Sequence, residues 1–219
     1  MSRPDGVRVK VLPEPNDFIQ QCDTGPAMPT EVEVVLAAIK ERRSIRAYED
    51  RPLDEATVTA VIEAGVHAPT AMGLQPWRFI VVRDRALMKQ ISDYCKPVLR
   101  GMLEGATDEM AVVFRALLSR EDFEIFYGAP VLVLVLGDEK NPYSTHDCTL
   151  CAGTMMLAAH AMGIGSCWIG SARPVAGNTE LMKRLGVPSG YAIIAPLIFG
   201  YPGERPEMPV RAEPMITWI

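Results

Sequence analysis

Two short segments of this chain carry residues suited to binding a planar, anionic ligand. Residues 42–46 place three arginines and a serine within five positions (Arg42, Arg43, Ser44 and Arg46). Residues 68–77 combine small side chains with proline and glycine and end in an aromatic ring. Arginine can hold a phosphate through two hydrogen bonds, and small side chains let the backbone approach a flat ring closely. Together the segments predict a site for an aromatic ligand with a phosphate tail.

The arginine segment brings two guanidinium groups together in either regular conformation. In an extended chain Arg42, Ser44 and Arg46 point to one side, and in a helix Arg42 and Arg46 share a face. The segment follows the predicted C-terminal end of a helix, where the helix dipole disfavours anions. Side chains, rather than a helix terminus, would therefore hold the phosphate. The alternative is a solvated basic face that pairs with nearby carboxylates such as Glu41.

The composition restricts the class of protein. A chain of 219 residues with 48% hydrophobic and 22% charged residues is typical of one globular domain. Its net charge of −5 argues against general nucleic-acid binding. Because the sequence has neither a long apolar run nor a secretory signal at its start, we expect a cytoplasmic protein with no membrane and no nucleic-acid partner.

A C-x-x-C pair, Cys148 and Cys151, offers a second candidate site. Such a pair can act as a redox couple or as half of a metal site, or it can be two small core residues one helical turn apart. The chain has five cysteines, an odd number that favours reduced thiols. No second pair completes a four-ligand cage, so we favour the core interpretation and predict no metal.

The hydrophobic pattern predicts interleaved helices and strands. Helices are expected from Thr30 to the arginines, from Asp54 to Gly65, over 85–95, over 104–120, over 147–162 and from Asn178 to Gly186. Strands are expected over 77–82, 131–136 and 192–199, whereas 164–170 is ambiguous. The continuous apolar run 131–136 predicts a strand buried on both faces.

Three regions need further comment. The spacing of Thr30 and Glu33 indicates a capping box. The segment 147–162 is almost wholly apolar, which predicts a helix buried on all sides. Residues 1–29 and the tail from Tyr201 are rich in proline and predict extended arms. We therefore expect an N-terminal arm, 1–29, and one domain, 30–219, with a central sheet flanked by helices.

The chain resembles the nitroreductase family of FMN-dependent flavoproteins. The resemblance rests on RRSIRAY (42–48), APTAMGLQPWRFIVV (68–82), the helix and turn from Asp147 to Gly170, and GYP at 200–202, and it covers residues 30–219. It implies an α+β, nitroreductase-like fold with a central mixed sheet flanked by helices. It also implies an intertwined homodimer that binds two FMN molecules at the subunit interface.

The resemblance also assigns site residues. The FMN phosphate and ribityl chain would contact Arg42, Arg43, Ser44, Arg46 and an arginine of the C-terminal arm, Arg211 rather than Arg205. The loop residues Pro69, Thr70, Ala71 and Gly73 would come from the other subunit and lie against the isoalloxazine ring. Trp168, Ile169 and Gly170 would pack on that ring and supply a backbone N–H near N5. Gly73 and Thr154 stand where the family often has asparagine, and the loss of the asparagine at position 73 removes a side-chain hydrogen bond near the flavin.

The implied reaction is a ping-pong transfer of electrons. NADH or NADPH would give a hydride to flavin N5, and a small acceptor such as a nitroaromatic or a quinone would then take the electrons. We predict no catalytic side chain, because solvent can deliver the protons; His67 would be a proton donor only if it is more than a helix-end residue.

Three alternatives stay open. The first is other chemistry on the same fold, such as reductive dehalogenation or flavin fragmentation, which the segment 96–127 would decide. The second is a flavin-binding protein without turnover, and the third is a thiol or metal redox protein built on Cys148 and Cys151.

Overall fold

The computed structural model describes residues 30–219, so the predicted arm 1–29 lies outside the described residues. The helices are α1 (Glu31–Glu41), α2 (Glu55–Gly65), α3 (Arg85–Met102), α4 (Glu109–Leu118), α5 (Ser144–Ala161) and α6 (Thr179–Leu185), with 3-10 segments η1 (Ala71–Gly73) and η2 (Gly170–Gly177). The strands are β1 (Trp77–Val82), β2 (Val131–Asp138), β3 (Gly165–Trp168) and β4 (Tyr191–Gly200). Within the described part of the chain, no helix combines the length and the apolar character needed to cross a membrane.

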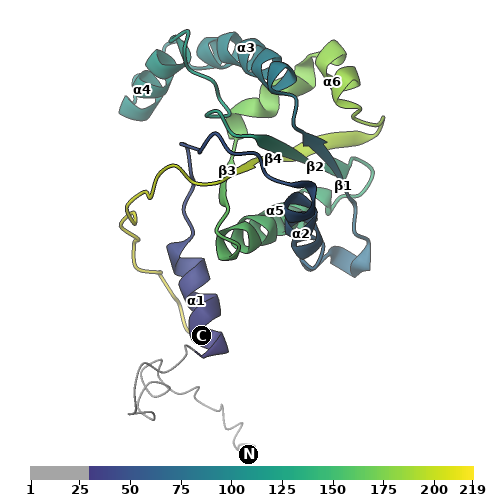
Figure 1. Cartoon of the computed structure of the whole chain (residues 1–219), viewed down its shortest axis with the longest axis vertical. Coiled ribbons are helices and arrows are strands. Elements are labelled where there is room, and N and C mark those ends of the chain that lie inside the picture. The colour runs from purple at the N-terminus through teal and green to yellow at the C-terminus, as the bar shows by residue number, and fades with distance from the viewer. Residues whose placement is uncertain (1–29) are drawn as a thin grey trace, which may run out of the picture. The chain divides into compact units, whose positions relative to one another are not determined.

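The strands form one sheet in the order β1-β2-β4-β3 (Figure 1). All three strand pairs are antiparallel. The parallel component of the predicted mixed sheet is limited to an isolated bridge between Ser44 and Ser166, beside β3. Helices cover both faces of this sheet, which confirms the predicted α+β class.

Strand β2 divides the core into two halves. Its sequence alternates valine and leucine, and alternate side chains of a strand point to opposite faces. The valines (Val131, Val133 and Val135) join a cluster with residues of α2 and α5. The leucines (Leu132, Leu134 and Leu136) join a second cluster with residues of α3, η2 and α6. The fully apolar run that predicted a strand buried on both faces is thus confirmed.

Most predicted helix ends are confirmed by their capping contacts. The side chain of Asp54 accepts a hydrogen bond at the start of α2, and that of Asn178 does so at the start of α6. Gly186 ends α6 in the left-handed conformation that glycine favours. Helix α3 begins as predicted but continues to Met102, through Pro97. Because Leu99 packs against the core beyond the proline, burial favours the extra turns over the lost hydrogen bond.

Two segments depart from the pattern for local reasons. Helix α4 begins at Glu109 rather than near 104, because Asp108 caps it by accepting from the Ala111 N–H. The ambiguous segment 164–170 forms β3 and the start of η2. A four-residue strand carries too little periodicity to be recognised, and its pairing with β4 defines it.

The prediction that the helix over 147–162 is buried on all sides is wrong for the single chain. One face of α5 packs on the sheet through Cys148, Cys151 and Met155. The opposite face is open: Leu150 is 48% exposed, and Thr149 and Gly153 are also exposed. Among residues 30–219, the sheet and α2 together cover only part of this apolar helix.

Helix α1 and the C-terminal tail are also exposed and apolar. The capping box is confirmed, since the Thr30 N–H donates to Glu33 at 2.8 Å and the Glu33 N–H donates to the Thr30 hydroxyl at 3.3 Å. These bonds lower the pKa of Glu33. No residue of α1 is buried, although it carries a stripe of apolar residues (Val32, Val35, Leu36 and Ile39). Beyond Tyr201 the chain has no helix, as predicted, and it exposes Val210, Met215 and Trp218.

The close packing of α2 on α5 leads to a stability prediction. A Cβ at Gly65 would overlap Met155 Cγ, so the Met155 side chain or the helix that carries it would have to shift. We expect Gly65→Ala to lower the free energy of unfolding by about 1–3 kcal/mol. Gly101→Ala in α3, where a Cβ meets nothing within 4 Å, should be neutral or stabilising. Thermal unfolding of both variants checks this; equal melting temperatures would contradict the packing account.

Candidate functional site

The arginine segment is extended, not helical. Helix α1 ends at Glu41, and the Ile45 N–H donates to the Ser166 carbonyl at 3.0 Å beside β3. The Arg46 N–H donates to Glu204 at 2.6 Å, which ties the segment to the chain beyond β4. In an extended backbone alternate residues point the same way, so Arg42, Ser44 and Arg46 share one side.

The surroundings of Cys167 show that these side chains gather in one place. Burial raises the pKa of the Cys167 thiol, while the charges of Arg46 and Arg42 and a hydrogen bond from Ser44 oppose that rise. The pKa of Tyr127 is likewise raised by burial and lowered by Arg46. The guanidinium groups of Arg42 and Arg46 therefore act on the same small region, which also holds the Glu204 carboxylate.

Arg43 points elsewhere and lines a cavity. Its Nη1 donates to the carbonyl oxygens of Lys40 at 2.6 Å and Arg42 at 2.8 Å, which caps the end of α1. Its Nε and the Ser166 hydroxyl oxygen are buried and have no hydrogen-bond partner in the described part of the chain. Both residues line a cavity of about 440 Å³ whose other lining residues are Glu41, Ile45, His160, Gly163, Ile164, Gly165, Pro202, Glu204, Arg205 and Pro206. Unpaired hydrogen-bonding atoms of residues that line a cavity are suited to a ligand with oxygen groups.

The turn after β3 lies at the far end of the strand that contacts Ser44. Trp168 packs against the core on the valine face of the sheet, and Ile169 is buried. The Ile169 N–H is not available to a ligand, because it donates to the Pro196 carbonyl at 2.8 Å. Gly170 is exposed, a Cβ there would meet nothing within 4 Å, and its N–H has no acceptor among residues 30–219. Of the three predicted residues, Gly170 is therefore the one whose N–H is available.

The predicted ring-binding loop has an unusual backbone. Met72, Gly73 and Gln75 all have positive φ angles, of 55°, 68° and 47°. Glycine and asparagine are the residues that best tolerate this conformation. Glycine at position 73, where the family often has asparagine, therefore preserves the backbone shape of the loop. The Ala71 N–H donates to the buried carboxyl of Asp147 at 3.1 Å, which attaches the loop to the start of α5.

A single chain does not bring all predicted site residues together. Asp147, which holds the loop, and His160, which lines the cavity with Arg43, are 13 positions apart on α5. At about 1.5 Å per residue this separates the loop from the arginine segment by roughly 20 Å along the helix. Of the two arm arginines, Arg205 lines the cavity, whereas Arg211 is exposed.

Some residues near the site had no predicted role. The Ser166 hydroxyl and the Glu204 carboxylate both lie beside the arginine segment. A serine in a short strand and a glutamate in a proline-rich tail carry no pattern that marks them. Their position depends on strand pairing between distant segments, which the sequence alone does not reveal.

The C-x-x-C pair is a core feature. Cys148 and Cys151 are both fully buried, and the Cys148 thiol donates to the Leu136 carbonyl at 3.5 Å. Burial raises the pKa of Cys148 to about 11 and that of Cys151 to about 12. Only about one thiol in a thousand or fewer is then ionised at pH 8, so neither is suited to redox exchange.

This burial predicts chemical inertness. In the folded protein at pH 8, iodoacetamide should leave Cys148 and Cys151 unmodified, because the thiolate is the reactive form. After unfolding in guanidinium chloride both should react, which serves as the control. Peptide mass spectrometry reads the result, and rapid labelling of the folded protein would revive the thiol-redox alternative.

Comparison with known proteins gives a consistent result. The model of the Nitroreductase family matches residues 39–201. The NADH dehydrogenase of Thermus thermophilus is 31% identical over 199 residues, which cover 83% of this chain and 94% of that protein. The iodotyrosine deiodinase of Thermotoga neapolitana is 29% identical over 180 residues, 78% of this chain and 90% of that one.

A solved structure agrees at the level of fold. A nitroreductase with bound FMN from Desulfitobacterium hafniense superposes with a TM-score of 0.73 at 29% identity, over 85% of this chain and 98% of that one. The family match covers most of the chain and includes the arginine segment, the loop, α5 and β3. On this evidence the chain belongs to the Nitroreductase family.

Proposed function

We propose that this protein transfers electrons from NADH or NADPH, through FMN, to a small acceptor such as a nitroaromatic or a quinone. Similarity to proteins named NAD(P)H nitroreductase and FMN reductase supports an NAD(P)H-dependent FMN oxidoreductase. The observation that carries the proposal is the convergence of Arg42, Ser44 and Arg46 beside β3, the strand that leads to the free N–H of Gly170. A cytoplasmic location stays a prediction from the sequence.

The residues present fit FMN. Its phosphate needs cations and hydrogen-bond donors, and Arg42, Ser44 and Arg46 supply both. The buried, unpaired Ser166 hydroxyl and Arg43 Nε add polar groups beside the same segment. We assign the phosphate and ribityl contacts to Arg42, Ser44 and Arg46, and the ring contacts to Trp168, Ile169 and Gly170. Arg43 and Arg211 stay predictions from the family resemblance, because Arg43 points toward the cavity and Arg211 does not line it.

Bound FMN supplies the chemistry, since its ring accepts a hydride from a reduced nicotinamide and returns electrons to an acceptor. The protein supplies orientation and electrostatics. The guanidinium groups fix one end of the ligand, so that its ring would lie along the turn after β3. The Gly170 N–H is a donor that needs no reorganisation, and such a donor stabilises charge that develops near it. No side-chain acid or base is assigned.

We further propose that the active form is a homodimer. The loop with Pro69, Thr70, Ala71 and Gly73 lies too far along α5 to reach the arginine segment of its own chain. The open apolar face of α5 and the exposed apolar tail are suited to contact with a second copy. In this assembly the loop of one subunit completes the site that the arginine segment of the other begins.

A visible absorption spectrum tests the enzymatic proposal. The purified protein should carry, or take up, FMN and show oxidised flavin bands. Anaerobic NADH or NADPH should bleach those bands, and a nitroaromatic or a quinone should restore them. A flavin that neither nucleotide reduces would favour a binding protein without turnover. No uptake of added FMN would overturn the proposal.

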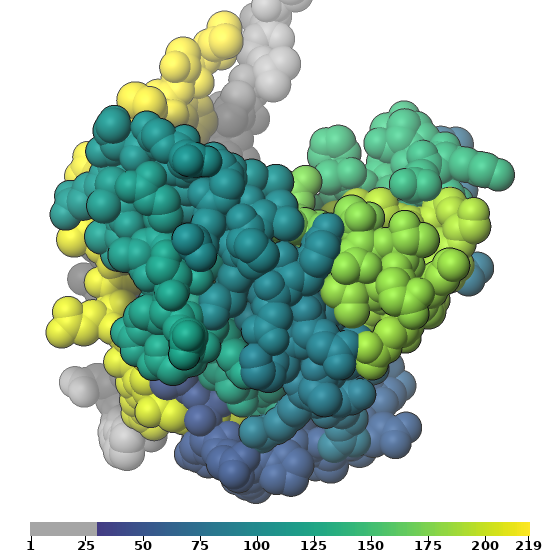
Figure 2. Space-filling view, turned by 90° about the horizontal axis from the view of Figure 1, so that it is seen from above, coloured from purple at the N-terminus to yellow at the C-terminus, as the bar shows by residue number. Residues whose placement is uncertain are grey.

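Reductive dehalogenation is the second candidate, and the similarity to a deiodinase favours it. The segment 96–127, which would decide between the two chemistries, exposes apolar side chains that include Met102 at the end of α3 and Met110 and Val113 on α4. Figure 2 shows α3 and α4, in teal, spread over one face of the molecule. Iodide release from 3-iodotyrosine by the reduced protein, measured beside nitroaromatic reduction, separates the two candidates.

A further inference from the structure

Asp147 holds the loop 69–75 in place. It lies in the first turn of α5 and is only 3% exposed. Its Oδ1 accepts the Ala71 N–H at 3.1 Å, across 76 positions of the sequence. Within residues 30–219 this is the only hydrogen bond that a side chain makes to residues 69–75. The remaining hydrogen bonds of the loop, at Gly73 and Leu74, are made to its own carbonyl oxygens.

The loop needs such support because its backbone is strained. Met72 and Gln75 have positive φ angles, and neither is glycine or asparagine. Conformations of this kind are costly and persist only where the surroundings enforce them. Met72 is 86% exposed, so packing of its side chain within this chain does not provide the constraint. The contact between Ala71 and Asp147 is therefore the interaction best placed to hold the loop.

The second oxygen of the Asp147 carboxyl does not take part in this contact. Asp147 Oδ2 is buried and has no hydrogen-bond partner within residues 30–219. Buried polar atoms normally have a hydrogen-bond partner. A role in stabilising the start of α5 alone therefore does not explain the unpaired oxygen. Ser144, in the same turn and also buried, differs in this respect, since its hydroxyl donates to the Asp138 carbonyl at 2.6 Å.

We infer that Asp147 is a positioning residue for FMN: through the Ala71 N–H it fixes the loop that one subunit places against the flavin of the other. This inference rests on the proposed function and on the proposed dimer. Asp147 acts through the loop and does not itself touch the reacting atoms. Its loss should therefore loosen the loop first, and weaken FMN binding as a consequence.

The experiment uses three variants of the full chain. Asp147→Ala removes the acceptor, Asp147→Asn keeps an oxygen that can accept the Ala71 N–H, and Ser144→Ala removes a buried hydrogen bond from the same turn without touching the loop. Hydrogen–deuterium exchange of the peptide spanning 69–75, measured without added FMN, reports the order of the loop. Fluorescence titration then gives the dissociation constant for FMN, and thermal unfolding reports stability.

We expect Asp147→Ala to raise exchange in the loop at least tenfold and to raise the FMN dissociation constant by a similar factor. Asp147→Asn should stay within about threefold of the wild type, because the hydrogen bond is retained. Ser144→Ala should lower the melting temperature but leave loop exchange and FMN affinity unchanged.

Several results would overturn the inference. The first is that Asp147→Ala and Ser144→Ala show the same loop exchange and the same FMN affinity. Asp147 would then contribute to helix stability alone. Another is equal impairment of Asp147→Asn and Asp147→Ala, which would assign the effect to charge rather than to the hydrogen bond. A wild-type protein that binds no FMN would instead refute the proposed function, and the exchange measurement would still test whether Asp147 orders the loop.

Discussion

Replacing Arg42 and Arg46 together by alanine is expected to weaken FMN binding by about 10²- to 10⁴-fold. A hydrogen bond to a charged group contributes about 1.5–3 kcal/mol, and each 1.4 kcal/mol is about a factor of ten. Both guanidinium groups act on the region around Cys167, so their losses should combine. Fluorescence titration of the apo variant with FMN measures the effect. Increasing salt should weaken the wild type more than the variant.

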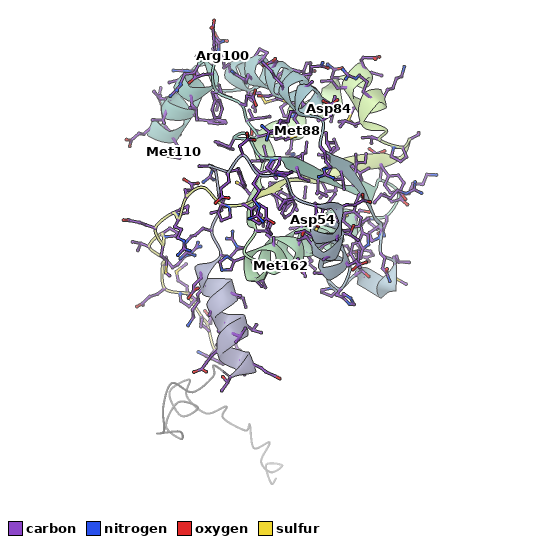
Figure 3. All side chains as sticks on the ribbon, viewed as in Figure 1. Asp54, Asp84, Met88, Arg100, Met110 and Met162 are labelled. Carbon is purple, nitrogen blue, oxygen red and sulfur yellow. The ribbon has the colours of Figure 1, made fainter. Side chains whose placement is uncertain are left out.

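The matched control is Arg100→Ala. Arg100 is an exposed arginine that projects outward near the end of α3, far along the chain from the arginine segment (Figure 3). Removing it changes the net charge of the protein without touching the proposed site, so FMN affinity should stay within about twofold of wild type. Equal losses in the control and the double variant would show that overall charge, not a phosphate site at residues 42–46, governs binding.

Leu150→Glu should convert the protein to a folded monomer that no longer retains FMN. Leu150 lies on the open face of α5 and is 48% exposed in the single chain, so a glutamate there costs the isolated subunit little. In the proposed dimer the same position faces a second copy, where a buried, unpaired carboxylate is very unfavourable. Sedimentation or light scattering gives the mass, and the flavin spectrum gives occupancy.

Val81→Glu is the control for this prediction. Val81 is another exposed apolar residue, but it lies on β1, at the opposite edge of the sheet from β3. It should leave both mass and flavin content unchanged. A Leu150→Glu protein that is monomeric yet fully loaded with FMN would show that one chain forms the whole site. A variant that remains dimeric would place the interface elsewhere.

The sequence was sufficient for those parts of the fold that local chemistry decides. The continuous apolar run of β2 predicted a strand buried on both faces, and Asp54 and Asn178 predicted helix starts. Each signal depends on neighbours within a few residues. The extent of α3 was underestimated because packing of Leu99 offsets a proline, and packing is not a local property.

The site shows the same division between local and distant information. The types of residue at 42–46 indicated a phosphate partner, because guanidinium chemistry is independent of the fold. The extended conformation of that segment follows from its pairing with Ser166, more than a hundred positions away. The exposed face of α5 could not be predicted either. The sequence of an apolar helix is the same whether residues of its own chain or of another chain bury it.

The length of α5 has a genetic consequence. Each subunit holds its loop at one end of this helix and its arginine segment near the other, so every site in the proposed dimer draws on two chains. Subunits lacking Arg42 and Arg46 should therefore complement subunits lacking Asp147. A mixed dimer would concentrate both defects in one site and leave the other intact. At an FMN concentration too low to load either variant homodimer, co-expression of the two alleles would then load about a quarter of all sites, as expected from random pairing in a twofold assembly.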